Sequence, residues 1–267
     1  MNYSQPDFHA LAQRFDAPGV NAIVLMGSHA RRHAGPYSDV DLVRLLAGDA
    51  EVPGAGSHLI DDHLIVVSNV TPAAVAGWFT DPVEATNTIA GLRTARALVD
   101  RDDTFAAIQA RAQAFVWDEE LQLRADCWAS EQMVGWIEEA HKGLEGLRQR
   151  DPGRMLNGLF GLSHGLSRVV QVQRGVLIRG DNGFYDDIAV AVGLDSLWVQ
   201  LRAIAFGVED VHGRPPSLRE RVVAGLHLYV TTAELVSESV QPEDEALIQA
   251  TVQLINDNLE RAYHGEE

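Results

Sequence analysis

Cysteine is almost absent from this sequence, since Cys127 is the only one in 267 residues. A single cysteine excludes an intrachain disulfide and a zinc site built from several cysteines, and it suits a reducing compartment. No apolar run approaches the roughly 18–20 residues that span a membrane. Residues 1–20 also lack the basic and apolar regions of a signal peptide. We therefore expect a cytoplasmic protein that does not enter a membrane.

Basic residues are scarce as well, with 21 Lys and Arg against 38 Asp and Glu and a formal net charge of −17. Because binding to a nucleic-acid backbone normally needs a basic surface, this charge disfavours a nucleic-acid partner. A cationic small molecule fits the charge better, although acidity also serves simply to keep a protein soluble. Hydrophobic residues make up 46% of the chain, which is enough for a folded core.

The first 118 residues alternate between strand and helix patterns. Short apolar runs predict strands at 22–26, 40–46, 58–60, 63–68 and 95–99. Periodicity and helix-start residues predict helices at 7–15, 28–34, 72–79, 82–92 and 103–115. Asp61-Asp62 is typical of a hairpin turn. Residues 1–118 are therefore expected to form an α+β domain, a small mixed β-sheet flanked by helices.

From residue 119 onward, apolar residues recur with the period of a helix, as at Met133, Trp136, Ile137, Ala140 and Leu144. We expect residues 119–267 to form an all-α up-and-down helical bundle. Gly158, Gly161 and Gly165 lie on one predicted helix, where a glycine costs about 1 kcal/mol, so they indicate close backbone packing. Asp181-Asn182-Gly183 predicts a turn between helices.

The stretch between the first two predicted strands carries the clearest chemistry. Gly27-Ser28 follows an apolar run and exposes backbone N–H groups at the start of a short helix, which favours an anion. Asp39 and Asp41 are two residues apart, so in a strand their side chains share a face. Two carboxylates beside a phosphate-binding turn suit a hard cation and a nucleoside triphosphate. Arg31 or Arg32 can offset the remaining phosphate charge.

Gly-Ser followed after ten residues by Asp-x-Asp-Leu resembles the signature of the DNA-polymerase-β-like nucleotidyltransferase superfamily. The longer run Gly-Ser-x-x-Arg-x-x-x-Gly-Pro-Tyr-Ser-Asp is similar to that of the kanamycin (aminoglycoside) nucleotidyltransferases, which move AMP from ATP to an aminoglycoside hydroxyl. The expected order of an α/β domain and a helical domain matches too. The resemblance implies a Mg²⁺-dependent adenylyltransferase with ATP as co-substrate, a small-molecule acceptor and a homodimer.

The same resemblance assigns roles to individual residues. It implies that Asp39 and Asp41 bind Mg²⁺ and take part in catalysis. It implies nucleotide binding by Gly27, Ser28, Arg31, Ser38 and Lys142.

A second match lies at Trp136-Ile-Glu-Glu-Ala-His-Lys142. Glu138 and Lys142 are four residues apart and lie on one helix face. By resemblance, Glu138 is the general base that deprotonates the acceptor, and Lys142 contacts the triphosphate. Glu139 is a rival for the base. An ordinary exposed Glu–Lys pair, which stabilises a helix by a few tenths of a kcal/mol, remains the alternative.

The pattern breaks on the strand at 63–68. The superfamily usually has a third acidic residue there, and the aligned position is Val66. Two other functions therefore stay open: a protein-AMPylating enzyme of toxin–antitoxin type, and a nucleotide-binding module without catalysis. His29 and His33 flank the motif, and we expect both to be solvated surface groups.

Overall fold

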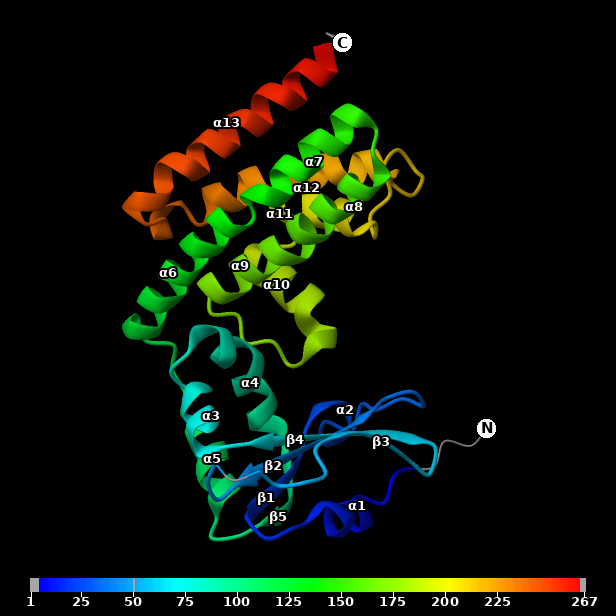
Figure 1. Ribbon diagram of the computed structural model, residues 1–267, viewed down its shortest axis with the longest axis vertical. Coiled ribbons are helices and arrows are strands. Elements are labelled where there is room, and N and C mark those ends of the chain that lie inside the picture. The colour runs from blue at the N-terminus through cyan, green and yellow to red at the C-terminus, as the bar shows by residue number, and fades with distance from the viewer. Residues whose placement is uncertain (1–4, 50, 265–267) are drawn as a thin grey trace. The chain divides into compact units, whose positions relative to one another are not determined.

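The computed structural model describes residues 5–49 and 51–264, which form two compact units. The first unit runs up to Trp117 and also includes Leu177–Gly183. The second unit comprises Asp118–Val176 and the chain from Phe184 onward. Figure 1 shows the strands of the first unit and the helices of the second. The division into domains 1–118 and 119–267 stays a prediction.

The first unit is built on a five-stranded mixed sheet with the strand order β3-β4-β2-β1-β5. The strands are β1 (Val20–Leu25), β2 (Val40–Leu46), β3 (Gly56–Ile60), β4 (His63–Val70) and β5 (Arg96–Asp100). β2 and β4 run parallel, and the other neighbours are antiparallel. Asp61 and Asp62 join β3 to β4 with φ angles of 48° and 64°, as in a type I′ turn. The predicted hairpin turn is confirmed.

Side chains of β1 alternate between two buried faces of the sheet. Ile23 and Leu25 pack in a cluster with residues of the first helix, whereas Ala22 and Val24 pack in the opposite cluster with residues of the fourth and fifth helices. The helices of this unit are α1 (Phe8–Phe15), α2 (Gly27–Ala30), α3 (Pro72–Gly77), α4 (Pro82–Thr94) and α5 (Thr104–Gln113). The predicted small mixed sheet flanked by helices is confirmed.

The second unit is helical, as predicted for the C-terminal half of the chain. Its helices are α6 (Glu119–Gly135), α7 (Ile137–Gln149), α8 (Pro152–Phe160), α9 (Leu166–Gln173), α10 (Phe184–Val192), α11 (Leu197–Phe206), α12 (Leu218–Leu235) and α13 (Pro242–His264). A π-helical turn, Gly161–Gly165, joins α8 to α9. Within the described residues, none of the helices combines the length and hydrophobicity of a membrane span. The cytoplasmic location stays a prediction.

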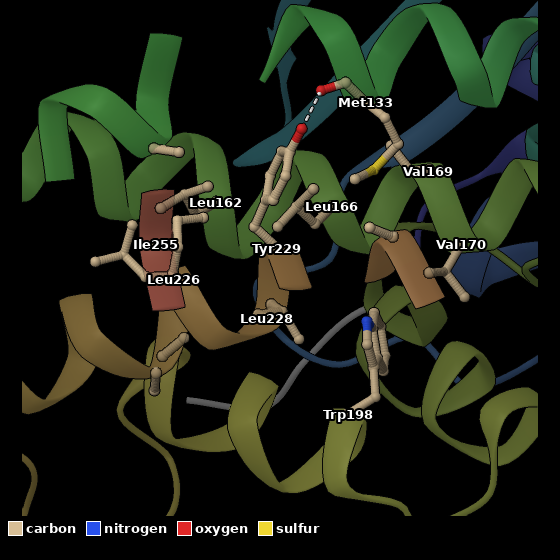
Figure 2. Close-up of a cluster of buried hydrophobic side chains, with 14 of the residues drawn as sticks. Met133, Leu162, Leu166, Val169, Val170, Trp198, Leu226, Leu228, Tyr229 and Ile255 are labelled. Carbon is tan, nitrogen blue, oxygen red and sulfur yellow. Dashed lines mark hydrogen bonds between the residues drawn. The ribbon is translucent and has the colours of Figure 1, made fainter. Parts of the chain in front are cut away.

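Large apolar side chains fill the core of the second unit, and the polar ends of two large aromatic residues form hydrogen bonds within it (Figure 2). The Tyr229 hydroxyl donates a hydrogen bond to the Met133 carbonyl at 3.1 Å. The Trp198 indole N–H donates to the Thr232 hydroxyl at 2.9 Å. Such pairing offsets most of the cost of removing these groups from water.

The glycines of α8 and the π-helical turn allow the close packing that the sequence predicts. A Cβ at Gly158 would lie 2.7 Å from the Glu139 carbonyl oxygen, and one at Gly165 would overlap the Trp136 ring. These glycines therefore let the backbone approach α7 and the residue before it. Their cost in helix propensity is offset by this contact.

Candidate functional site

The turn after β1 places a glycine directly against an aspartate. The Met26 N–H donates to the Asp41 carbonyl at 2.9 Å, so the chain leaves β1 beside β2. Gly27 has a φ of 65°, and a Cβ there would overlap Asp41 Oδ2. Both facts require glycine, because other residues are strained at this φ and would displace the carboxylate. Gly27 thus lets Asp41 reach the backbone of the turn.

The helix after this turn is shorter than predicted. α2 ends at Ala30 rather than at residue 34, because Arg32 has a left-handed φ of 62°. The loop after it is tight, since the Gly35 N–H donates to the Ser38 hydroxyl at 2.9 Å and the Ser38 N–H donates back to the Gly35 carbonyl at 3.1 Å. Ser38 therefore has a structural role in delivering the chain to β2, and its hydroxyl hydrogen remains available to a ligand.

Asp39 precedes β2 and Asp41 lies within it, so both carboxylates project toward one face of the sheet. Burial raises the pKa of Asp41 to about 6, and the negative charges of Asp39 and Asp181 add to this effect while Arg31 opposes it. Across the parallel pairing of β2 with β4, the residue opposite Asp41 is Val66. Val66 is the residue that the resemblance aligns with the usual third acidic residue, so β4 supplies no carboxylate opposite Asp41.

Asp39 and Asp41 together supply the number of carboxylates that commonly holds a Mg²⁺ ion. Mg²⁺ is commonly held by one or two carboxylates and completes its octahedron with waters and substrate phosphates. Among the described residues, no three His, Cys, Asp or Glu side chains are grouped so that they alone could hold an ion. A half-buried carboxylate repelled by its neighbours is stabilised by a cation. The pair thus suits an ion shared with a phosphorylated ligand.

A segment distant in sequence completes the surroundings of Asp41. Leu177–Gly183, here called the strap, belongs to the first unit although helices of the second unit flank it in sequence. The Ile178 N–H donates to the Thr86 carbonyl of α4 at 2.9 Å. The Arg31 guanidinium donates to the Arg179 carbonyl at 2.7 Å. The strap therefore fixes Arg31.

The strap also carries Asp181, whose charge reaches Asp41. The sequence predicts only a turn at 181–183, and the short 3₁₀ helix there agrees with it. The sequence does not predict that Asp181 lies close enough to Asp41 to act on its charge. The interruption of helical periodicity around Gly175 and Gly180 signals a loop, but nothing in the local sequence says which surface that loop covers.

The expected base and lysine lie in the second unit, on α7. Lys142 Nζ lies 2.8 Å from Glu138 Oε1 and 3.1 Å from Glu139 Oε1. The hydrogen bond from Lys142 lowers the pKa of Glu138, whose side chain is 74% exposed. Glu139 is 19% exposed, and its buried Oε2 has no hydrogen-bond partner. The predicted pairing of Glu138 with Lys142 is present, while their meeting with the Asp pair in one site stays a prediction.

His29 differs from the expectation of a solvated surface group. Its side chain is 4% exposed, and its ring packs edge-on against Phe8 with centroids 5.5 Å apart. Burial lowers the pKa of His29. The expectation was wrong because the ring of Phe8, the first residue of α1, packs against the His29 ring. His33 is exposed, as predicted.

No protein-family model matches this chain, and no curated protein matches it. Among solved structures, the chain is similar to a nucleotidyltransferase-like protein from Exiguobacterium sibiricum, with a TM-score of 0.47 and 12% sequence identity, covering 96% of this chain and 78% of that chain. Identity this low bears on the fold alone, and a TM-score of this size does not support a functional conclusion.

Proposed function

We propose that this chain is a Mg²⁺-dependent nucleotidyltransferase that transfers AMP from ATP to a hydroxyl of a small-molecule acceptor. One observation carries the proposal. Asp41 is held against the glycine of the turn and next to Asp39, in surroundings that raise its pKa to about 6. Without a bound cation, an ionised Asp41 in these surroundings lowers the stability of the fold. Carboxylates with a strongly shifted pKa cluster at functional sites. The Gly-Ser and Asp-x-Asp-Leu motif supports the same conclusion.

In the proposed reaction, the acceptor oxygen forms a bond to the α-phosphorus of ATP. The bond from that phosphorus to the bridging oxygen breaks, pyrophosphate leaves, and the acceptor proton passes to a base of the protein. Asp39 and Asp41 would hold Mg²⁺, which when bound supplies positive charge to the phosphate oxygens and helps to align them. Ser28 would donate its hydroxyl and backbone N–H to phosphate oxygens. Arg31, fixed by the strap, would orient its remaining N–H groups toward them.

For the base, we propose Glu138. Its pKa is lowered by Lys142, so it is ionised at neutral pH and able to accept a proton. Lys142 would then neutralise phosphate charge as a compact cation. Glu139 is the second candidate. The net charge of −17 favours a cationic acceptor such as an aminoglycoside, and we propose that the enzyme acts as a homodimer.

A nucleotide-binding module without catalysis is a second candidate function, favoured by the pairing of Val66 with Asp41. Without a carboxylate at that position, one of two metal sites would lack a ligand. Transfer of AMP to a protein rather than to a small molecule is the other outcome that the test must separate.

The test uses the full chain, Mg²⁺, ATP labelled at the α-phosphate, a panel of aminoglycosides and a cell extract. We expect label on a small molecule and release of pyrophosphate. Asp39→Asn and Asp41→Asn should abolish both. Asp62→Asn is the matched control, because it makes the same change in the hairpin turn of the same sheet, where φ is 64° and asparagine is tolerated.

Label on protein would instead identify an AMPylating enzyme. ATP binding without pyrophosphate release, unchanged by Val66→Glu, would identify a module without catalysis. Wild-type activity in both aspartate variants would show that the site is elsewhere. Glu138→Gln and Glu139→Gln, compared for kcat at saturating ATP, identify the base, since the variant without a base should lose about 10²–10⁴-fold.

A further inference from the structure

A hollow of about 440 Å³ lies beside α2 in the first unit. It is lined by Gln5, His29, Arg32, Ala34 and Arg96. Its volume falls within the range of small-molecule sites, roughly 300–1,000 Å³. None of these five residues is acidic, although the chain as a whole has a net charge of −17. The hollow is therefore a basic feature of an acidic protein.

Strand pairing puts this hollow on the face of the sheet that packs against α1. Arg96 lies opposite Leu25, whose side chain belongs to the cluster with α1, so Arg96 projects toward that face. Leu25 also lies opposite Leu42, and Asp41, the residue before Leu42, projects toward the other face. The hollow is thus separate from the Asp pair, and a ligand in it is not the ATP that we propose there.

The consecutive arginines Arg31 and Arg32 serve these two different places. Arg31 donates to the strap and its charge acts on Asp41, whereas Arg32 lines the hollow. The left-handed φ of 62° at Arg32 ends α2, and a glycine would make the same turn without steric strain. Strained residues of this kind cluster at ligand sites and other functional positions. The turn at Arg32 therefore adds a guanidinium group to the hollow despite the strain.

Neither guanidinium group of the hollow has a partner within residues 5–49 and 51–264. The side chains of Arg32 and Arg96 make no hydrogen bond or ion pair there. Other arginines of the unit are held: Arg93 donates to backbone carbonyls, and Arg101 pairs with Asp16 at 2.7 Å. Guanidinium groups present paired N–H donors that match the oxygens of a phosphate. A phosphate group has three such oxygens and nearly two negative charges, so it can engage both arginines.

His29 gives the hollow a fixed wall. Its side chain is 4% exposed, and its ring packs against Phe8 and forms a hydrogen bond with the backbone of Ser38. The ring is therefore held by two different segments of the chain. A wall held in this way keeps the hollow open between Arg32 and Arg96 and lowers the ordering cost of binding a ligand.

We propose that the hollow beside α2 is a second anion site, which binds the phosphate group of a small molecule through Arg32 and Arg96. The hollow is larger than a phosphate ion, so the part lined by Gln5, His29 and Ala34 receives the organic portion of the ligand. The site is independent of the proposed function, because none of its residues takes part in the proposed transfer of AMP.

The experiment measures, by calorimetry on the full chain at low salt, the binding of glucose 6-phosphate, inorganic phosphate and glucose. We expect both phosphates to bind and glucose not to bind. Arg96→Ala and Arg32→Gly should each weaken binding of both phosphates about tenfold to a hundredfold, since each removes a charge-assisted contact. Arg32→Lys should retain part of the affinity. Thermal melting checks the fold, and Arg32→Gly should melt near the wild type because glycine adopts this φ freely.

Two other arginines of the first unit are the matched controls. A neighbouring hollow of about 670 Å³ is lined by Arg14 together with Asp7 and Asp61, so it carries charges of both signs. Arg14→Ala removes a positive charge from that hollow, and Arg31→Ala removes one from the proposed ATP site. Both variants should bind glucose 6-phosphate with the affinity of the wild type.

Unchanged affinity in both Arg32→Gly and Arg96→Ala would overturn the site, and so would an equal loss in Arg14→Ala. A loss confined to Arg31→Ala would place the phosphate at the proposed ATP site and would also overturn it. Simultaneous binding of glucose 6-phosphate and α,β-methylene-ATP, which cannot transfer AMP, supports two separate sites, whereas mutual exclusion refutes them. If the chain transfers no AMP, the proposed function fails, and a loss in the Arg32 and Arg96 variants still establishes the anion site.

Discussion

The substitution Asp41→Asn is expected to stabilise the metal-free protein while abolishing AMP transfer. Asp41 is half-buried, and both Asp39 and Asp181 repel its charge. Asparagine keeps the shape of the side chain and removes the charge. Residues that lower the stability of the fold are expected at sites where the function requires them.

The magnitude follows from the pKa of Asp41, which rises from 3.8 to about 6. At a pH above both pKa values, a shift of this size lowers the free energy of unfolding by about 3 kcal/mol. Solvent screens a half-buried carboxylate, so we expect a gain of about 1–2 kcal/mol for Asp41→Asn. This gain corresponds to a melting temperature roughly 2–6 °C higher.

The pH dependence gives the sign of the effect. Between pH 3.8 and about 6, the folded protein keeps the Asp41 proton that the unfolded chain has lost. The free energy of unfolding of the wild type therefore falls as the pH rises through this window, and it is level above it. The advantage of Asp41→Asn should be absent near pH 4 and complete near pH 7.5.

The assay is urea unfolding in EDTA at both pH values, with Asp62→Asn as the control for loss of a carboxylate. Adding Mg²⁺ at pH 7.5 should stabilise the wild type and leave Asp41→Asn unchanged. A variant that gains nothing at pH 7.5, or gains the same amount at pH 4, would refute the reasoning about burial and repulsion.

Two further predictions concern packing. Gly27→Ala should lower both stability and AMP transfer, because a Cβ at a φ of 65° would overlap Asp41 Oδ2; thermal melting and the labelling assay check this, and normal transfer would contradict it. Tyr229→Phe should cost about 1 kcal/mol, because the hydroxyl that bonds the Met133 carbonyl is lost in the core. Urea unfolding measures that cost, and transfer at low temperature should not change.

Much of the first unit follows from its sequence because the signals are local. The apolar runs that become β1 and β2 are short and bounded by turn residues, so the strands and the Gly27 turn between them can be predicted. The Asp61-Asp62 hairpin follows from turn chemistry. Val66, which the family resemblance aligns with the usual third acidic residue, lies opposite Asp41 in the sheet.

The features that the sequence did not reveal depend on contacts between distant segments. His29 is buried because α1 packs over it, although its own neighbours are polar or small. The early end of α2 depends on a left-handed Arg32, for which the helical pattern at 28–34 gives no warning. Periodicity describes a residue's own element and does not identify what covers it.

The strap shows how such a distant contact changes the chemistry of a site. Because Val66 contributes no charge, the sheet supplies two carboxylates, and the additional negative charge that acts on Asp41 comes from Asp181. The strap also holds Arg31, the cation that opposes this effect. A cation bound at the Asp pair would cancel the repulsion of Asp181 and so stabilise the strap in its place. Since such coupling is reciprocal, a displacement of the strap alters the affinity of the Asp pair for that cation by the same free energy.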